Sequence, residues 1–83
     1  MQLAKYVKFR TEKFGSVLFE TRSEKVFTLN PTATAVVREI EAGGDEAAIM
    51  ARLKDRFEDR DGAIEREVAA LIADLRQRGL VED

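Results

Sequence analysis

The side chains that carry most acid–base and nucleophilic catalysis are scarce in this sequence of 83 residues. Histidine and cysteine are both absent, which removes the commonest general base, the commonest metal ligand and any thiolate nucleophile. The two serines, Ser16 and Ser23, lie outside any nucleophile motif, and Gly43 and Gly44 lack the surrounding pattern of a phosphate-binding loop. We therefore expect a binding module with no cofactor and no metal site, not an enzyme.

Acidic residues gather in the run from Glu58 to Gly62, and carboxylates in such a run can bind a cation. The run does not match a calcium-binding loop, and Arg60 lies inside it. We interpret it as a solvated connector between two helices.

The chain changes character at the stretch from Lys25 to Thr32. Its first half is rich in Val, Phe, Thr and Leu, which favour a strand. Its second half favours a helix start, because Asn30 can cap a helix and Pro31 fits the first helical turn. Strand-like alternation comes before this junction and helical periodicity after it, which is the order of an α+β domain.

Alternation of polar and apolar residues predicts three short strands, over residues 6–12, 16–21 and 25–29. Gly15 relieves the backbone in the first connection. The polar turn Arg22–Glu24 predicts a hairpin between the second and third strands. Residues 1–5 are expected to be a loose lead-in.

Three helices are predicted after the junction, and each carries an apolar stripe at helical spacing. The stripes consist of Ala33, Val36, Val37 and Ile40, then Ile49, Met50, Leu53 and Phe57, then Ile64, Val68, Leu71, Ile72 and Leu75. Asp45 and Asp61 are the expected caps of the second and third helices, and the end at Leu80-Val81 is expected to fold back onto the core. We therefore expect one domain over residues 1–83, a three-stranded antiparallel sheet followed by a three-helix bundle, similar to a winged helix-turn-helix.

Charge is divided unevenly along the chain, although the total is only −2. Residues 1–29 carry six basic and three acidic residues, whereas residues 30–83 carry eight basic and thirteen acidic ones. An acidic helical part argues against binding nucleic acid, where neutralising phosphates supplies most of the affinity. No apolar run is long enough to cross a membrane, and the first residues lack the apolar segment of a signal peptide. We expect a cytoplasmic protein with no membrane partner.

Two binding modes fit this architecture. A winged helix-turn-helix would place the third helix on DNA, but its exposed positions mix both signs of charge and match a phosphate-facing helix poorly. The other mode is strand addition, in which an extended peptide pairs with an open sheet edge. Residues alone leave open a third interpretation, that Glu24 and Lys25 only protect an ordinary edge from aggregation.

The sequence resembles the PqqD family of RiPP recognition elements, small modules that bind the leader segment of a ribosomally synthesised precursor peptide. The resemblance covers about residues 7–82. It is carried by Val26-Phe27-Thr28-Leu29-Asn30-Pro31-Thr32-Ala33, Val36-Val37, Ile49, Leu53, Val68, Leu71-Ile72, Leu75 and Arg78-Gly79-Leu80-Val81, with Gly15-Ser16-Val17-Leu18-Phe19 similar to the family's second strand. One departure is Ala42-Gly43-Gly44, where the family usually has Asp-Gly.

The resemblance implies a mechanism for this chain. The leader is expected to add as an antiparallel strand on residues 25–29 and to lie in a groove between that strand and the third helix. The module then presents the precursor to a modifying enzyme, often a radical SAM enzyme, and acts as a monomer or weak dimer without a cofactor. The peptide-binding residues expected on this basis are Lys25, Val26, Phe27, Thr28 and Leu29 on the strand and Glu65, Val68, Ala69, Ile72 and Arg76 on the helix. For Val68, Ile72 and Phe27 the alternative is ordinary core packing.

Overall fold

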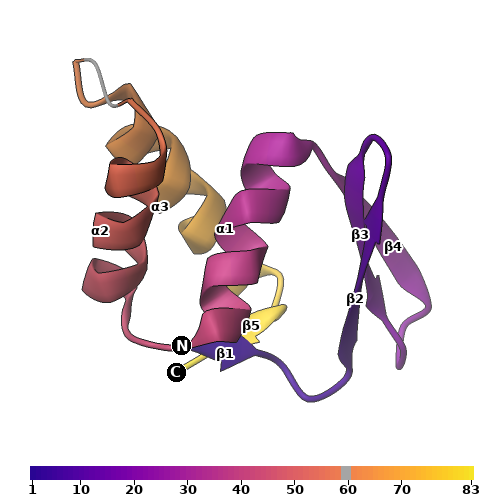
Figure 1. The fold of residues 1–83 in the computed structure, drawn as a ribbon. Helices are drawn as coiled ribbons and strands as arrows, with labels where there is room; N and C mark the ends of the chain where they lie inside the picture. Colours follow the sequence, from indigo (N-terminus) through magenta and orange to yellow (C-terminus); the bar gives the residue numbers. More distant parts are fainter. Residues whose placement is uncertain (59–60) are drawn as a thin grey trace.

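Strands come first along the chain and helices second, as the sequence pattern predicts (Figure 1). The computed structural model describes residues 1–58 and 61–83, so Asp59 and Arg60 of the predicted connector lie outside the described residues. The elements are β1 (Gln2–Leu3), β2 (Val7–Glu12), β3 (Gly15–Glu20), β4 (Lys25–Leu29), α1 (Pro31–Ala42), α2 (Glu46–Arg56), α3 (Ala63–Gln77) and β5 (Val81–Glu82). No helix in the described part of the chain is long and apolar enough to span a membrane.

The main sheet is antiparallel, with the strand order β2-β3-β4. Residues 13 and 14 connect β2 to β3, and residues 21–24 connect β3 to β4. In the second hairpin Leu18 is opposite Phe27 and Ser16 is opposite Leu29. The predicted strands and hairpin are therefore confirmed, and β4 has the predicted bounds.

Two of the three predicted helix caps are confirmed. The Asn30 side chain accepts a hydrogen bond from Ala33 N at 2.8 Å, and Asp45 accepts one from Ala48 N at 2.8 Å. The prediction for Asp61 is wrong, because α3 begins after Gly62 and no side chain caps it. Asp61 itself has a left-handed backbone with φ of 59°, and a cap residue normally has an extended one.

The two ends of the chain pair with each other, which the sequence pattern did not indicate. Gln2 is opposite Glu82 and Leu3 is opposite Val81 in the antiparallel ladder between β1 and β5, and Figure 1 shows both ends below α1. The prediction of a loose lead-in over residues 1–5 is therefore wrong. Two-residue strands carry too short a pattern to be recognised by alternation.

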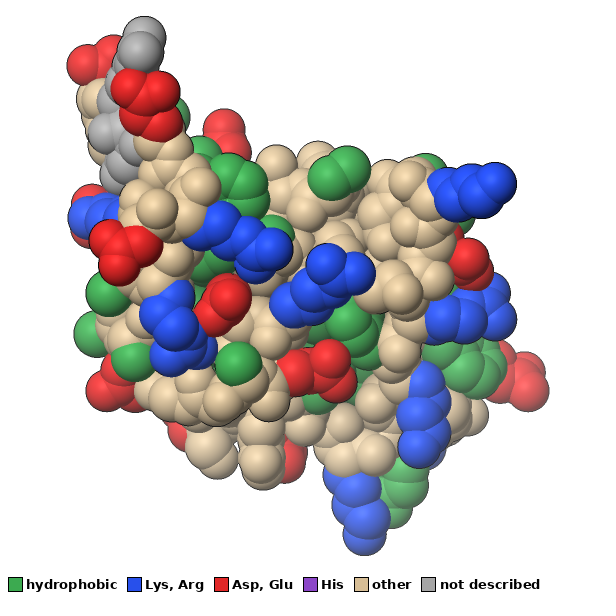
Figure 2. Space-filling view, in the orientation of Figure 1, with side chains coloured by type: hydrophobic (Ala, Val, Ile, Leu, Met, Phe, Trp, Pro, Cys, Tyr) green, Lys and Arg blue, Asp and Glu red, His purple; other side chains and the backbone are tan. Residues whose placement is uncertain are grey.

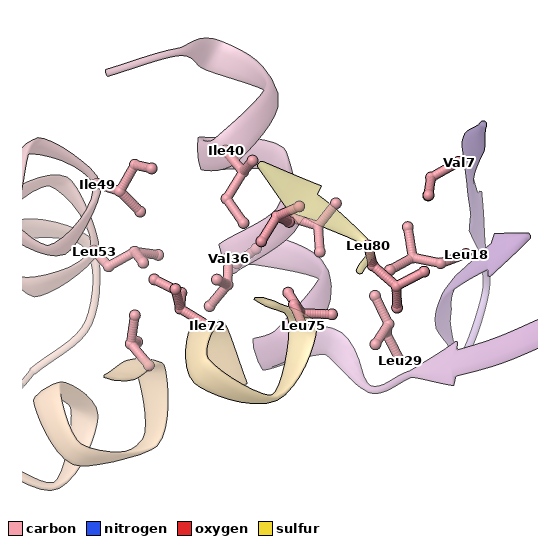
Figure 3. Close-up of a cluster of buried hydrophobic side chains, with 14 residues drawn as sticks. Val7, Leu18, Leu29, Val36, Ile40, Ile49, Leu53, Ile72, Leu75 and Leu80 are labelled. Carbon is pink, nitrogen blue, oxygen red and sulfur yellow. The ribbon is translucent and has the colours of Figure 1, made fainter. Parts of the chain in front are cut away.

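The core lies between the sheet and the three helices (Figure 3). Leu18 contributes from β3, Val36 and Ile40 from α1, Leu53 from α2 and Ile72 from α3, and each is fully buried. Leu80 and Val81 are also buried, which confirms that the end of the chain folds back onto the core. The inward face of β3 is tied to α1 by the buried hydroxyls of Ser16 and Thr34, which lie 2.6 Å apart. The sheet is thus fixed to the helices through β3 and α1.

Arg52 of α2 holds the end of α1. Its Nε donates to Glu39 Oε2 at 2.5 Å, and its Nη2 donates to the carbonyls of Glu39 at 3.0 Å and Gly43 at 2.7 Å. The last carbonyls of a helix lack partners within the helix, and a guanidinium supplies several donors in a fixed geometry. This contact stabilises the end of α1 at Ala42 and its cap residue Gly43.

We expect Arg52→Ala to lower the free energy of unfolding by about 1–3 kcal/mol, the usual cost of leaving such hydrogen-bonded groups unpaired. Arg52→Lys should recover only part of this loss, because an ammonium cannot bond both carbonyls and the carboxylate in the same planar geometry. Chemical denaturation followed by circular dichroism measures the effect. Arg38→Ala, at an exposed position of α1, is the control; a loss equal to that of Arg52→Ala would contradict the assignment.

Candidate functional site

β4 lies at the edge of the main sheet, and among the described residues no strand pairs with its outer side. Successive residues of a strand direct their N–H and C=O groups to opposite sides. Thr21 directly follows β3 and donates its N–H to Tyr6 O, toward β2, at 2.9 Å. The N–H and C=O groups of residues 16, 18 and 20 are therefore directed toward β4. These residues of β3 are opposite residues 29, 27 and 25 of β4. The remaining residues of β4, Val26 and Thr28, direct their N–H and C=O groups to the open edge.

The side chains of β4 alternate between two environments. Leu29 is buried and Phe27 is half-buried on the side of the helices, whereas Val26 is 59% exposed and Thr28 is exposed on the outer side. The strand thus presents an unpaired backbone edge with apolar side chains on one face of it.

A hollow of about 340 Å³ lies directly beside this edge. One wall is β4, from Val26 to Leu29. The opposite wall comes from α3 and the segment after it, with Leu71, Asp74, Leu75, Arg78 and Leu80. The hollow is a groove between a strand and a helix, and apolar side chains from both walls line it together with Thr28, Asp74 and Arg78.

Two further hollows extend this groove in both directions. A hollow of about 420 Å³ continues past Leu71 to the start of α1 and includes Asn30, Ala33 and Glu67. A hollow of about 280 Å³ shares Phe27 and Arg78 with the central one and reaches Lys25 and the β3–β4 turn. We call the three hollows together the β4–α3 groove. It runs along the whole length of β4.

Arg78 lies across one end of this groove. Its Nε donates to Asp74 Oδ2 at 3.0 Å, and its guanidinium carbon lies 5.3 Å from the centre of the Phe27 ring. A guanidinium at this distance is attracted by the face of an aromatic ring. Arg78 therefore connects α3 to β4 without covering the backbone edge of β4.

The turn before β4 is held by the carboxylate of Glu20. Its two oxygens accept hydrogen bonds from the backbone N–H of Arg22 at 3.0 Å and of Ser23 at 2.9 Å. Hydrogen bonds to the charged carboxylate lower the pKa of Glu20 from 4.5 to about 2. The largest cause is a bond from the Ser23 side chain, followed by the bond from the Arg22 backbone N–H. Bonding to the charged form stabilises that form. The carboxylate thus fixes the turn that leads into β4.

A lowered pKa makes the stability of the turn dependent on pH. The contribution of Glu20 is complete above about pH 4.5 and is lost as the pH falls toward 2, because the unfolded carboxyl binds its proton first. We expect a carbon-detected NMR titration of Glu20 to give a pKa near 2. We also expect the thermal unfolding midpoint of the Glu20→Gln variant to fall less than that of the natural protein when the pH is lowered from 7 to 3. A Glu20 pKa above 4 would contradict the assignment.

The structure places the predicted site residues in two groups. Lys25, Val26, Phe27, Thr28 and Leu29 together form the open strand and line the β4–α3 groove. Of the residues predicted for the α3 wall, which are Glu65, Val68, Ala69, Ile72 and Arg76, only Val68 lines the groove, in the hollow near the start of α1.

The other four predicted positions of α3 do not line the groove, and of these Ala69 is exposed to solvent. Ile72 is 1% exposed and belongs to the core, as does Val68 at 1%. Glu65 Oε2 accepts a bond from Lys54 Nζ of α2 at 2.8 Å, and Arg76 Nη2 lies 3.5 Å from Glu46 Oε1 of α2. Glu65 therefore points toward α2, and Arg76 lies between α2 and the end of the chain, where its Nη2 donates to Asp83 Oδ1 at 3.0 Å. The wall that lies beside β4 consists of Leu71, Asp74, Leu75, Arg78 and Leu80, and Glu67 continues it in the hollow near the start of α1.

The outer face of the sheet carries a separate hollow of about 360 Å³. It is lined by Lys8, Arg10, Val17, Phe19 and Val26, so its centre is apolar and its margin basic. Figure 2 shows Lys and Arg side chains over the strands at the right of the view. Within residues 1–58 and 61–83 no group of three or more acidic, histidine or cysteine side chains is placed to hold a metal ion.

Comparisons with known proteins agree on one family and one fold. The family model for "Coenzyme PQQ synthesis protein D (PqqD)" matches residues 15–81. A lasso peptide synthetase B1 complexed with the leader peptide has a TM-score of 0.81 and 27% sequence identity over 99% of this chain and 96% of that chain. TbiB1 in complex with the TbiA(beta) leader peptide has a TM-score of 0.85 and 17% identity, covering 99% of this chain and 95% of that chain. This second likeness concerns the fold alone. No curated protein gives a match in sequence.

Proposed function

The chain belongs to the PqqD family, and we propose that it binds the leader segment of a ribosomally synthesised precursor peptide. The leader adds to β4 as an antiparallel strand and lies in the β4–α3 groove. Two solved proteins of the same fold are complexes with leader peptides, which supports this choice of ligand.

The observation that carries the proposal is the unpaired edge of β4 beside an apolar groove. A guest strand can exchange N–H and C=O bonds with Val26 and Thr28, and each such bond contributes about 1 kcal/mol net. Main-chain pairing gives affinity for any extended peptide, and side-chain pockets at alternate positions select among sequences. Phe27, Leu71 and Leu75 offer such an apolar pocket in the middle of the groove.

Presentation of the bound precursor to a modifying enzyme is the second half of the proposal, and a radical SAM enzyme is the partner that the family suggests. The role requires no catalysis and no cofactor from this chain. Precursor peptides are made on ribosomes, so the role places the protein in the cytoplasm.

The test uses synthetic, fluorescein-labelled peptides that cover the first halves of short reading frames encoded beside the gene. We expect one of them to give saturable anisotropy and to shift the NMR amide signals of Val26 and Thr28. The same amides should exchange more slowly with deuterium when the peptide is bound, because they become paired.

Two outcomes would contradict the proposal. One is the absence of binding by every such peptide, and the other is binding that shifts β2 or α2 and leaves β4 unchanged. A random DNA duplex in the same titration at low salt is the control, since a DNA-binding helix would give affinity that falls steeply with salt.

A further inference from the structure

The charge of the side chains that line the β4–α3 groove differs between its two ends. At the end near α1 it is lined by Glu67, and no Lys or Arg lines that hollow among the described residues. At the end near the β3–β4 turn it is lined by Lys25 and Arg78. Phe27, Leu71 and Leu75 lie between the two ends. The groove is thus acidic, then apolar, then basic.

The acidic groups at the basic end are already engaged. Glu20 is bonded to backbone N–H groups of its own turn, and Asp74 accepts the Nε–H of Arg78. That bond uses one of the five donors of the guanidinium, and the two terminal nitrogens of Arg78 have no hydrogen bond to any described residue. Lys25 likewise forms no ion pair with the part of the chain that the structure describes. This end therefore offers donors to an incoming carboxylate.

Helix dipoles act against the side-chain charges at both ends. The start of α1 adds about half a positive charge near Glu67, and the end of α3 adds about half a negative charge near Arg78. A full charge on Glu67 exceeds the first. At the other end the charges of Glu20 and Asp74 balance those of Lys25 and Arg78, so an incoming carboxylate is bound there by the free donors of Lys25 and Arg78 and not by a net positive charge.

The direction of the guest strand turns this polarity into a sequence pattern. A strand antiparallel to β4 begins beside Leu29 and ends beside Lys25, so its first residues lie near Glu67 and its last near Arg78. Glu67 and Arg78 are eleven residues apart on α3, which is about 16 Å along a helix. An extended peptide covers this distance in about five residues. Since residues of one face alternate, the facing positions are about four or six apart.

We infer that the groove selects leader segments in which a basic residue precedes apolar residues and an acidic residue follows them. Glu67 contacts the basic residue, and Arg78 with Lys25 contacts the acidic one. This inference rests on the proposed function, and it names the peptide class and the direction in which the peptide lies.

The probes are two synthetic heptapeptide cores with the same composition, each with Ser-Gly flanks at both ends. One core is Lys-Thr-Leu-Thr-Leu-Thr-Glu, and the other exchanges its Lys and Glu. We expect the first to bind about fivefold to tenfold more tightly in an NMR titration of the full chain, the range for two solvent-exposed charge contacts. We expect the preference to shrink at high salt.

A charge-reversed protein completes the test. The double variant Glu67→Lys, Arg78→Glu should prefer the second peptide. The control is Glu65→Lys, Arg76→Glu, which makes the same change on the same helix at positions that do not line the groove, and it should keep the preference for the first peptide.

The outcomes separate the two levels of the proposal. Equal affinity for both peptides with shifts at Val26 and Thr28 overturns the charge pattern and leaves strand addition standing. If the control variant reverses the peptide preference and the double variant Glu67→Lys, Arg78→Glu does not, the assignment of Glu67 and Arg78 is overturned. Failure of both peptides to bind at millimolar concentration overturns the charge pattern, whereas failure of every leader peptide in the anisotropy titration overturns peptide recognition on β4.

Discussion

Thr28→Pro is expected to abolish measurable leader binding while the domain remains folded. The N–H of Thr28 is directed to the open edge of β4, and proline removes that donor. The guest carbonyl opposite then lacks a partner, and the pyrrolidine ring occupies the space into which the guest backbone must come. A lost bond with an unpaired buried acceptor costs about 1–3 kcal/mol, and the clash adds to it, so we expect affinity to fall at least about 100-fold.

The fold should tolerate this change because proline is compatible with an edge strand whose N–H points to solvent. The fixed φ of proline lies within the range of extended backbone. Phe27, which precedes position 28, is already extended, as a residue before proline must be. Isothermal calorimetry with a leader peptide measures binding, and thermal unfolding confirms the fold.

Two matched variants make the result interpretable. Thr28→Ala keeps the N–H and removes the exposed side chain, so binding should change by less than about threefold. Phe27→Pro removes an N–H that is directed to β3, and it should destabilise the sheet itself. Retained binding by folded Thr28→Pro would contradict pairing on this edge.

Most of the fold follows from local pattern in the sequence. The junction at Asn30 and Pro31 marks the change from strand to helix, and the Asn30 cap is formed as its side chain predicts. Asp45 acts in the same way at α2. These signals are strong because a short polar side chain satisfies backbone groups next to it, independently of the rest of the chain.

Features that depend on distant contacts were not predictable in this way. The pairing of β1 with β5 joins residues at opposite ends of the chain. Asp61 has the right side chain for a cap, but its left-handed backbone moves the start of α3 to the following residue. The first case reflects a tertiary contact, whereas the second is a local backbone conformation that the side-chain type does not indicate.

The candidate site shows the same division. The strand Lys25–Leu29 lies at the sheet edge as expected, because an edge strand is defined by its place in the hairpin, and its part in peptide binding stays a prediction. The helix half was displaced around α3, since Glu65 and Arg76 flank the apolar stripe on one side and Glu67 and Arg78 flank it on the other. Helical spacing places both edges beside the core equally well. Which edge meets β4 depends on the rotation of α3, which the burial of Val68, Ile72 and Leu75 sets.

The backbone of Gly15 approaches the end of β4 too closely for any side chain. A Cβ atom at Gly15 would lie 2.1 Å from Leu29 O and 2.9 Å from Asn30 C, and the φ of Gly15 is +148°. Both neighbours are backbone atoms at the junction between β4 and α1, so neither can move without displacing the strand or the helix cap.

Gly15→Ala is therefore expected to lower the free energy of unfolding by more than about 4 kcal/mol, in the range of the most severe single substitutions. A small domain has only about 5–15 kcal/mol in total, so a large part of the protein should be unfolded at 37 °C. Circular dichroism during urea denaturation measures the loss.

Gly79→Ala is the matched control for this prediction. Gly79 also has a positive φ, +73°, but a Cβ there meets no atom within 4 Å, so it carries the backbone cost of about 1–2 kcal/mol without the clash. Similar midpoints for the two variants would show that β4 can move away from β3 at its end. Such freedom would also contradict the rigid edge on which leader binding depends, because a strand that shifts to admit a methyl group does not hold Val26 and Thr28 in place for a guest.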